Sequence, residues 1–167
     1  RLFGGRLYQF FLKNTGRPAQ AMDMTQEVFE RIWRHRDDFQ TGRLQTWIFR
    51  IARNLLIDEW RKRGRSEVLV DEMPDVADPQ SRVEATVLDK LARNEASKLI
   101  DASLEKLSES DRLVIGLVYL GGLSFPEMAE VMEIPLGTAK TRVRQARLRL
   151  ESHMREQMQG RSVGEAI

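Results

Sequence analysis

The sequence has no cysteine and only two histidines among its 167 residues. Without cysteine there are no disulfide bonds, thiolate metal sites or cysteine nucleophiles. This composition fits a protein of a reducing compartment. His35 and His153 lie far apart in charged helical stretches, and no phosphate loop, metal-ligand cluster or nucleophile elbow is present. We therefore expect no enzyme, no metal site, no cofactor and no small-molecule substrate.

Long hydrophobic runs are also missing. The longest mostly apolar stretch without a formal charge, residues 113–126, is too short to span a bilayer and contains three glycines. We find no signal peptide. The sequence starts at Arg1 rather than Met, inside a segment with helical spacing, so we expect the natural N-terminus to lie upstream.

Excess charge of one sign is absent, because 27 basic residues are nearly balanced by 25 acidic ones, for a net charge of +2. Only the distribution of charge along the chain can therefore indicate a partner. With 41% hydrophobic residues the chain can bury a core, which excludes wholesale disorder.

Apolar residues recur at spacings of three and four almost throughout, which predicts an all-α protein. We expect two small helical domains, at residues 1–64 and 85–160, joined by a flexible acidic linker at 65–84. Its residues 65–82 contain Pro74, Pro79 and five acids. It is either a solvated tether, which its composition favours, or an acidic strand that lies in a basic channel of a partner.

The C-terminal block contains a predicted helix-turn-helix. Ser124 and Glu127 have the spacing of a capping box, with Pro126 in the first turn. Residues 134–137 (IPLG) then break the helix, and we expect a second helix to begin at Thr138. This order, in which a short turn with Gly and Pro joins two helices, is typical of the DNA-binding helix-turn-helix.

The second helix separates its residues by face when it is projected at 100° per residue. Ala139, Val143, Ala146 and Leu150 share the side that we expect to be buried. The opposite side and its flanks hold five cations and no acid, so central residues can reach base edges and flanking cations can reach phosphates. The alternative is a solvated cationic face. The predicted DNA-binding residues are Lys140, Thr141, Arg142, Arg144, Gln145, Arg147 and Arg149.

A helix predicted at residues 45–63 also separates its apolar and its cationic residues onto different faces. Its expected core stripe consists of Leu44, Ile48, Ile51, Ala52 and Leu55, with a third flank of Phe49, Leu56 and Trp60 against other helices. Opposite the stripe lie Arg50, Arg53, Asn54 and Arg61, with Trp47 at the edge. Cations beside an aromatic suit single-stranded nucleic acid, because an unstacked base can stack on the ring. From pattern alone, however, we favour a core Trp47 and solvated arginines.

The preceding helix, predicted at residues 19–36, has a second candidate surface. We expect it to bury Ala21, Thr25, Val28, Phe29 and Ile32. Its other face presents a tryptophan among acids, which indicates either a protein contact or an ordinary polar face. The residues of that face are Asp23, Gln26, Glu27, Glu30, Trp33 and Arg34.

These segments, in this order, resemble bacterial sigma factors of the extracytoplasmic-function (ECF) group over nearly the whole chain. The N-terminal match is residues 23–29 (DMTQEVF), Trp33, residues 46–54 (TWIFRIARN) and Asp58. The C-terminal match is residues 123–130 (LSFPEMAE) and 134–147 (IPLGTAKTRVRQAR). Either block alone is suggestive; the pair joined by an acidic linker is highly specific.

The resemblance implies a role for each block. The first would recognise and melt the promoter −10 element, through Phe39 and Arg43 of a base-capturing loop together with the Trp47 face. The second would bind the −35 element, with Lys140, Thr141, Arg144 and Gln145 matching the family's contacts. The linker would pass through core RNA polymerase near the RNA exit path. Docking on the polymerase's largest subunit would use Asp23, Gln26, Glu27, Glu30 and Trp33.

The resemblance also implies a cytoplasmic protein, with core RNA polymerase, promoter DNA and a commonly membrane-anchored anti-sigma factor as partners. The chain departs from the pattern at four places. Trp47 is followed by Ile48 where housekeeping members have a second tryptophan, so we expect dependence on near-consensus promoters. Met22 replaces a common acid, and Ser108 a common proline. Gly116 lies inside a helix, where glycine is unfavourable. It marks either a packing contact with a regulator or a position with no functional role.

The main alternative is a conventional helix-turn-helix regulator with a helical sensor or dimerisation domain. It would need a ligand pocket or a dimer seam in the first block, where we find polar and basic faces instead. A dimeric regulator should protect a palindrome, whereas a sigma factor should protect two unlike elements.

Overall fold

All elements that the structure describes are helices, as the sequence predicted. It is a computed structural model that describes residues 3–39, 41–64 and 90–164, so the predicted linker at 65–84 and its acids lie outside the described residues. The helices, in chain order, are α1 (Gly4–Thr15), α2 (Pro18–Arg34), η1 (Arg36–Asp38), α3 (Leu44–Lys62), α4 (Lys90–Glu105), α5 (Glu109–Ile115), η2 (Gly116–Leu120), α6 (Phe125–Met132) and α7 (Leu136–Gly164).

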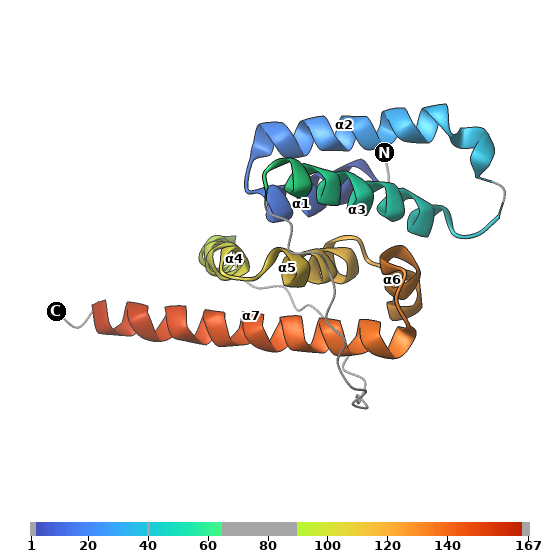
Figure 1. The fold of residues 1–167 in the computed structure, drawn as a ribbon. Helices are drawn as coiled ribbons and strands as arrows, with labels where there is room; N and C mark the ends of the chain where they lie inside the picture. The colour runs from blue at the N-terminus through green and yellow to red at the C-terminus, as the bar shows by residue number, and fades with distance from the viewer. Residues whose placement is uncertain (1–2, 40, 65–89, 165–167) are drawn as a thin grey trace.

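Helices α1, α2 and α3 pack together as an N-terminal unit (Figure 1). Gly16 adopts a positive φ of 68° after α1, a conformation that glycine takes without steric cost, and Pro18 begins α2. The core contains Phe10, Phe11 and Phe49, all fully buried. The ring of Phe10 meets Phe11 and Phe49 edge to face, at centroid separations of 5.3 and 5.7 Å. Such aromatic pairs are favourable beyond the area they bury.

Two residues expected in this core are exposed instead. Phe29 is 41% exposed because its ring lies against the first turn of α1 at Gly4, which has no side chain to cover it. Leu44 is 45% exposed, since it is the first residue of α3 and lies at the end of the buried stripe. The expected third flank of α3 is confirmed, because Phe49, Leu56 and Trp60 are all buried.

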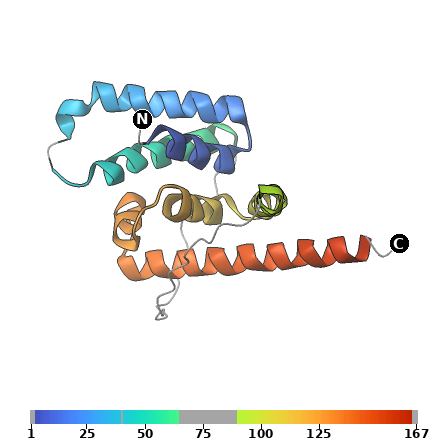
Figure 2. The ribbon, with the colours of Figure 1, turned by 180° about the vertical axis from the view of Figure 1, so that it is seen from behind.

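Helices α4 to α7 form a C-terminal unit in which α5 lies between the N-terminal unit and α7 (Figures 1 and 2). Ser108 caps α5, accepting a hydrogen bond from the backbone N–H of Asp111 at 3.1 Å, which gives this departure from the family pattern a structural reason. Helix α7 continues well beyond the motif, to Gly164. The core contains Leu113, Val114, Leu117, Met128, Val131, Ala139, Val143 and Ala146.

The two units pack directly on each other, α3 against α6 and α1 against α5 and η2. Two glycines allow this close approach. A Cβ at Gly116 would lie 3.0 Å from both Asn14 Nδ2 and Phe10 Cδ2, and one at Gly121 would lie 3.0 Å from Phe49 Cε1. Gly116 therefore marks a packing contact, but the partner is the chain's own helix α1 rather than a regulator.

Candidate nucleic-acid interfaces

The helix-turn-helix consists of α6, a short turn and the start of α7. The predicted capping box is confirmed: the backbone N–H of Ser124 donates to Glu127 Oε2 at 2.8 Å, and that of Glu127 donates to Ser124 Oγ at 3.3 Å. Glu133 ends α6 in the left-handed conformation, at φ 57°. The second helix begins at Leu136, two residues before the predicted Thr138, because Pro135 fits just ahead of a helix.

Helix α7 buries the face that its periodicity predicted. Ala139, Val143 and Ala146 are buried, and their small size lets α5 and α6 approach closely, whereas Leu150 is only half-buried. On the other side Lys140 is exposed, while Thr141, Arg142, Arg144 and Gln145 are half-buried. Lys140, Arg142 and Arg144 take part in none of the ion pairs among the described residues. These cations are therefore available to a polyanion.

The two other predicted phosphate contacts on α7 have acidic neighbours. Arg149 Nη1 donates to both carboxylate oxygens of Asp111, at 2.9 and 2.8 Å, and so ties α7 to α5. Arg147 Nε lies 3.6 Å from Glu151 Oε1. Any contact that Arg149 makes with phosphate must compete with this bifurcated, charge-assisted hydrogen bond, which periodicity could not reveal.

Three of the cations on α3 and just before it face the C-terminal unit. Arg43 Nη1 donates to Glu127 Oε1 at 2.9 Å, and Arg50 Nη2 donates to Glu130 Oε1 at 3.3 Å. Arg53 Nη1 lies 3.7 Å from Glu133 Oε2. Arg61 is exposed, with Asp58 at 3.9 Å. The predicted α3 residues therefore fall into two groups: these cations, and the side chains around a pocket.

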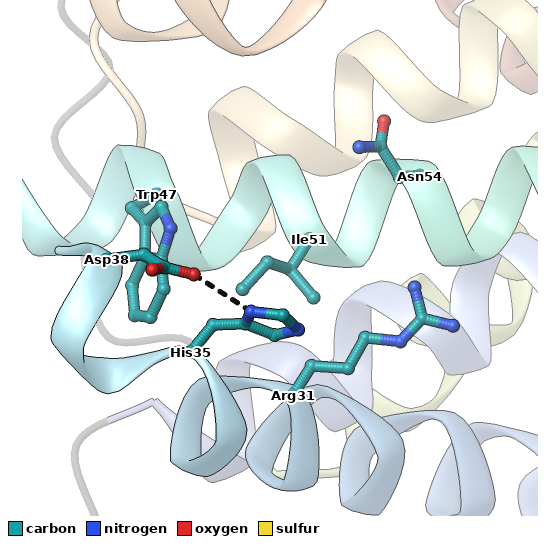
Figure 3. Close-up of a pocket in the computed structure, with 6 residues that line it drawn as sticks. All are labelled: Arg31, His35, Asp38, Trp47, Ile51 and Asn54. Atoms are coloured by element: carbon teal, nitrogen blue, oxygen red, sulfur yellow. Dashed lines mark hydrogen bonds and ion pairs between the residues drawn. The ribbon is translucent and has the colours of Figure 1, made fainter.

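That pocket, of about 240 Å³, opens between α2 and α3 (Figure 3). Trp47, Ile51 and Asn54 line its α3 side. The other side consists of Arg31, His35 and Asp38, with His35 Nδ1 2.9 Å from Asp38 Oδ2. Phe39 lies next to Trp47, with ring centroids 5.3 Å apart and planes tilted by 38°. Arg31 and His35 were not among the predicted site residues, because the pocket arises from helix packing that no sequence motif records.

Burial and pairing shift the ionisation of groups at the α3–α6 contact. Burial works against ionisation of Glu127, but hydrogen bonds from Arg43 and Ser124 outweigh it and hold the pKa of this carboxyl below its usual value. The same bond from Arg43 to Glu127 raises the pKa of the arginine. Burial lowers the pKa of Arg53, only partly offset by Glu133. Of these cations, Arg53 is thus the one whose loss of hydration is least well offset by an acidic partner.

The third predicted surface lies on α2. Asp23, Gln26 and Glu30 are exposed, and Trp33 is 70% exposed. The Arg36 guanidinium lies 4.7 Å from the centre of the Trp33 ring, in a cation–π contact. Glu27 is half-buried and accepts a hydrogen bond from Arg31 at 2.8 Å, which lowers the pKa of this carboxyl. The structure thus exposes an aromatic ring beside carboxylates, as the prediction of a protein contact on this face requires.

The chain matches known families in both units. Residues 1–66 match the sigma-70 region 2 model, and residues 97–150 match the sigma-70 region 4 model. The ECF RNA polymerase sigma factor SigW of Bacillus subtilis is 32% identical over 161 residues, covering 93% of this chain and 86% of the relative. RpoE of Cereibacter sphaeroides, another ECF sigma factor, is 30% identical over 158 residues, covering 91% of this chain and 82% of the relative.

Solved structures agree with this relationship. RpoE of Bartonella quintana, in complex with the anti-sigma factor NepR, superposes with a TM-score of 0.68 at 27% identity over 92% of each chain. CnrH, in complex with the cytosolic domain of CnrY, shares the fold, with a TM-score of 0.64 at 24% identity over 90% of this chain and 81% of its own. The chain belongs to the ECF RNA polymerase sigma factors, proteins that direct promoter-specific transcription initiation.

Two further features are absent from the described part of the chain. None of the helices there combines the length and apolar character needed to cross a bilayer. No group of three or more His, Asp or Glu side chains at residues 3–39, 41–64 and 90–164 is placed to hold a metal ion.

The lowered pKa of Glu127 predicts a pH-dependent contribution to stability. Its carboxylate stabilises the folded chain above the unfolded-state pKa near 4.5, and this contribution is lost as pH falls through the lower folded-state value. We expect Glu127→Gln, which keeps a capping side chain but cannot titrate, to lower the free energy of unfolding at pH 7 by on the order of 0.5–1 kcal/mol.

Urea unfolding of the wild type and Glu127→Gln, from pH 7 down to the lowest pH at which both stay folded, measures this difference. The gap should close as the pH falls below 4.5. A gap of constant size over the whole range would contradict the ionic role of Glu127.

Proposed function

We propose that this sigma factor holds the promoter at two places, with α7 on the −35 duplex and with α3 and its pocket on the −10 element. The observation that carries the proposal is the position of these surfaces. The α3 face and the pocket lie within the region 2 match, whereas α6 and the cationic part of α7 lie within the region 4 match. The proposed domains are residues 1–64 and 85–160, with the linker at 65–84 passing through the polymerase.

At the −35 element, α7 would lie in the major groove. Arg144 suits guanine and Gln145 suits adenine, because each can make two hydrogen bonds to its base edge. Lys140 and Thr141 would contact neighbouring positions. Leu148 is exposed on the same side and suits a thymine methyl group. The flanking cations Arg142, Arg147 and Arg149 would contact phosphates and so set the position of the helix.

At the −10 element, the pocket beside Trp47 would receive one extruded base. Its volume of about 240 Å³ is smaller than the roughly 300–1,000 Å³ of sites for drug-sized ligands, so the pocket suits a small ligand such as a single base. Trp47 and Phe39 offer stacking surfaces, and Asn54, His35 and Asp38 offer hydrogen-bonding groups. Stacking on an aromatic ring is worth about 1–3 kcal/mol per base, which helps to repay the cost of extrusion. Arg43, Arg50, Arg53 and Arg61 would bind the phosphates of the separated strand.

The exposed face of α2 would dock on core RNA polymerase through Asp23, Gln26, Glu27, Glu30 and Trp33. An anti-sigma factor is proposed as the regulator because the related RpoE of Bartonella quintana was solved with one. We place the action of the chain in the cytoplasm, where polymerase and promoter DNA are found. The proposed action is binding and strand separation, without enzymatic catalysis.

Transcription in vitro tests the proposal against the conventional-regulator alternative. The chain, added to core polymerase and a promoter library, should select templates that share two unlike elements and should start transcription from them. Footprints on selected promoters should cover both elements. A chain that protects a palindrome without polymerase, or that neither binds core nor directs initiation, would contradict the proposal.

Two arginine variants separate base reading from phosphate binding on α7. Arg144→Ala should cost about 1–3 kcal/mol on the preferred −35 sequence and relax discrimination at one position. Arg147→Ala should weaken binding to all sequences alike and reduce the salt dependence by about one phosphate contact. Fluorescence anisotropy with holoenzyme, on the selected −35 duplex and its single-base variants, measures both effects. Equal losses that ignore sequence in both variants would refute the assignment of faces.

A further inference from the structure

A row of carboxylates on and just after α6 faces a row of arginines on and just before α3. Glu127, Glu130 and Glu133 are spaced by three residues, so they follow one side of the short helix. The arginines at 43, 50 and 53 likewise share one side of α3. Each arginine meets one glutamate in order along the chain, with N–O separations of 2.9, 3.3 and 3.7 Å. The α3 surface that would bind −10 phosphates is therefore already occupied by acids of the same chain.

Further contacts hold this arrangement in register. Gln45 Nε2 donates to the backbone carbonyls of Gly121 and Gly122, at 2.9 and 3.1 Å. Arg6 also donates to the Gly121 carbonyl, and Lys13 pairs with Asp101 on α4. Because these contacts involve α1, α3 and both ends of the C-terminal unit, they fix the orientation of the whole unit and not of α6 alone.

We propose that the α3–α6 contact is an autoinhibitory lock, in which the three glutamates take the place of DNA phosphates on the arginines of α3. The proposal rests on the proposed −10 function of α3. In the closed chain Arg43, Arg50 and Arg53 are paired with these glutamates, so a −10 strand must displace the carboxylates before it can bind all three arginines. The cations of α7 remain open, because Lys140 and Arg144 enter none of the ion pairs in the described part of the chain. The lock thus masks one promoter-binding surface and leaves the other available.

The pairing in the lock is incomplete, which makes it displaceable. The Nε atoms of Arg50 and Arg53 are buried and have no acceptor. The third pair, Arg53 with Glu133, is an ion pair at 3.7 Å rather than a hydrogen bond. A buried donor without an acceptor destabilises the state that contains it. A DNA backbone offers more oxygens than the three carboxylates, so it can satisfy donors that the glutamates leave unpaired.

The experiment measures the affinity of the 167-residue chain for a fluorescein-labelled single-stranded DNA of random sequence. The test variant combines Glu130→Gln with Glu133→Gly. Glycine is favoured in the left-handed conformation of residue 133, so the end of α6 is preserved. At about 50 mM salt we expect about three- to tenfold tighter binding than for the wild type, because the closed population no longer reduces the apparent affinity. The difference should shrink toward unity in high salt, which screens the lock itself.

A matched control separates the lock from a general change in net charge. Glu105→Gln with Glu156→Gln removes two charges, as the test variant does, but from exposed positions of the C-terminal unit outside the contact. The affinity of this control should change less than twofold.

A second opening variant, Gly116→Leu, opens the contact without changing any charge. Its backbone is right-handed helical, and its Cβ already meets Asn14 and Phe10 of α1 at 3.0 Å. Circular dichroism shows whether each variant keeps its helices.

Tighter binding by both opening variants, without tighter binding by the control, supports the lock. Equal binding by the wild type and both opening variants would overturn it while leaving the −10 face of α3 intact. A gain by the charge control as large as that of the test variant would also overturn it. No binding by any variant, including the open ones, would refute both the lock and the −10 assignment of α3.

Discussion

The arginines at 43, 50 and 53, on and just before α3, are the feature on which the rest of the structure depends, because they hold α6 and we propose that they also bind promoter DNA. In the closed chain their partners are the glutamates of α6, and at a promoter we propose phosphates. Arginine is well suited to both, since its planar group binds carboxylate and phosphate oxygens in the same geometry. The register of α6 on α3 and, in the proposal, the accessibility of the −10 surface follow from which partner holds these side chains.

The ion pairs alone are a weak source of cohesion. Partly exposed pairs contribute about 0.2–1 kcal/mol each, so three of them supply at most a few kcal/mol. The close approach of apolar surface at Gly116 and Gly121, against Phe10 and Phe49, contributes the rest of the contact. We infer that packing brings the units together and that the charges set the register and the sensitivity to salt. A contact of this strength is suited to a state that must open in use.

The sequence predicted the features that depend on near neighbours. The capping box at Ser124 and the small-residue face of α7 follow from spacing along one helix, and both are present. The exposure of Phe29 and Leu44 could not be predicted, because it depends on what the neighbouring elements leave uncovered. Gly116 was noticed as unusual, but its partner on α1 is about a hundred residues away in the chain.

The candidate site divides in the same way. Periodicity placed Trp47, Asn54 and the arginines at 50, 53 and 61 on one side of a helix, but only the family resemblance assigned that side, and Arg43 before it, to the −10 element. His35 and Arg31 line the pocket because α2 packs beside α3. The carboxylates at 130 and 133 have the regular spacing of an acidic row, yet nothing in that spacing says which cations it meets. Local rules thus located the surfaces, and only the packing of the two units showed that two of them face each other.

The absence of cysteine makes a direct measurement possible, because spin labels attach only where a cysteine is introduced. Ala19→Cys on α2 and Ser152→Cys on α7 are substitutions of small, exposed residues, one in each unit. Double electron–electron resonance should give one narrow distance in the free chain and a longer, broader distribution with saturating single-stranded DNA. The same narrow distance with and without bound DNA would contradict competition between α6 and DNA for the arginines of α3.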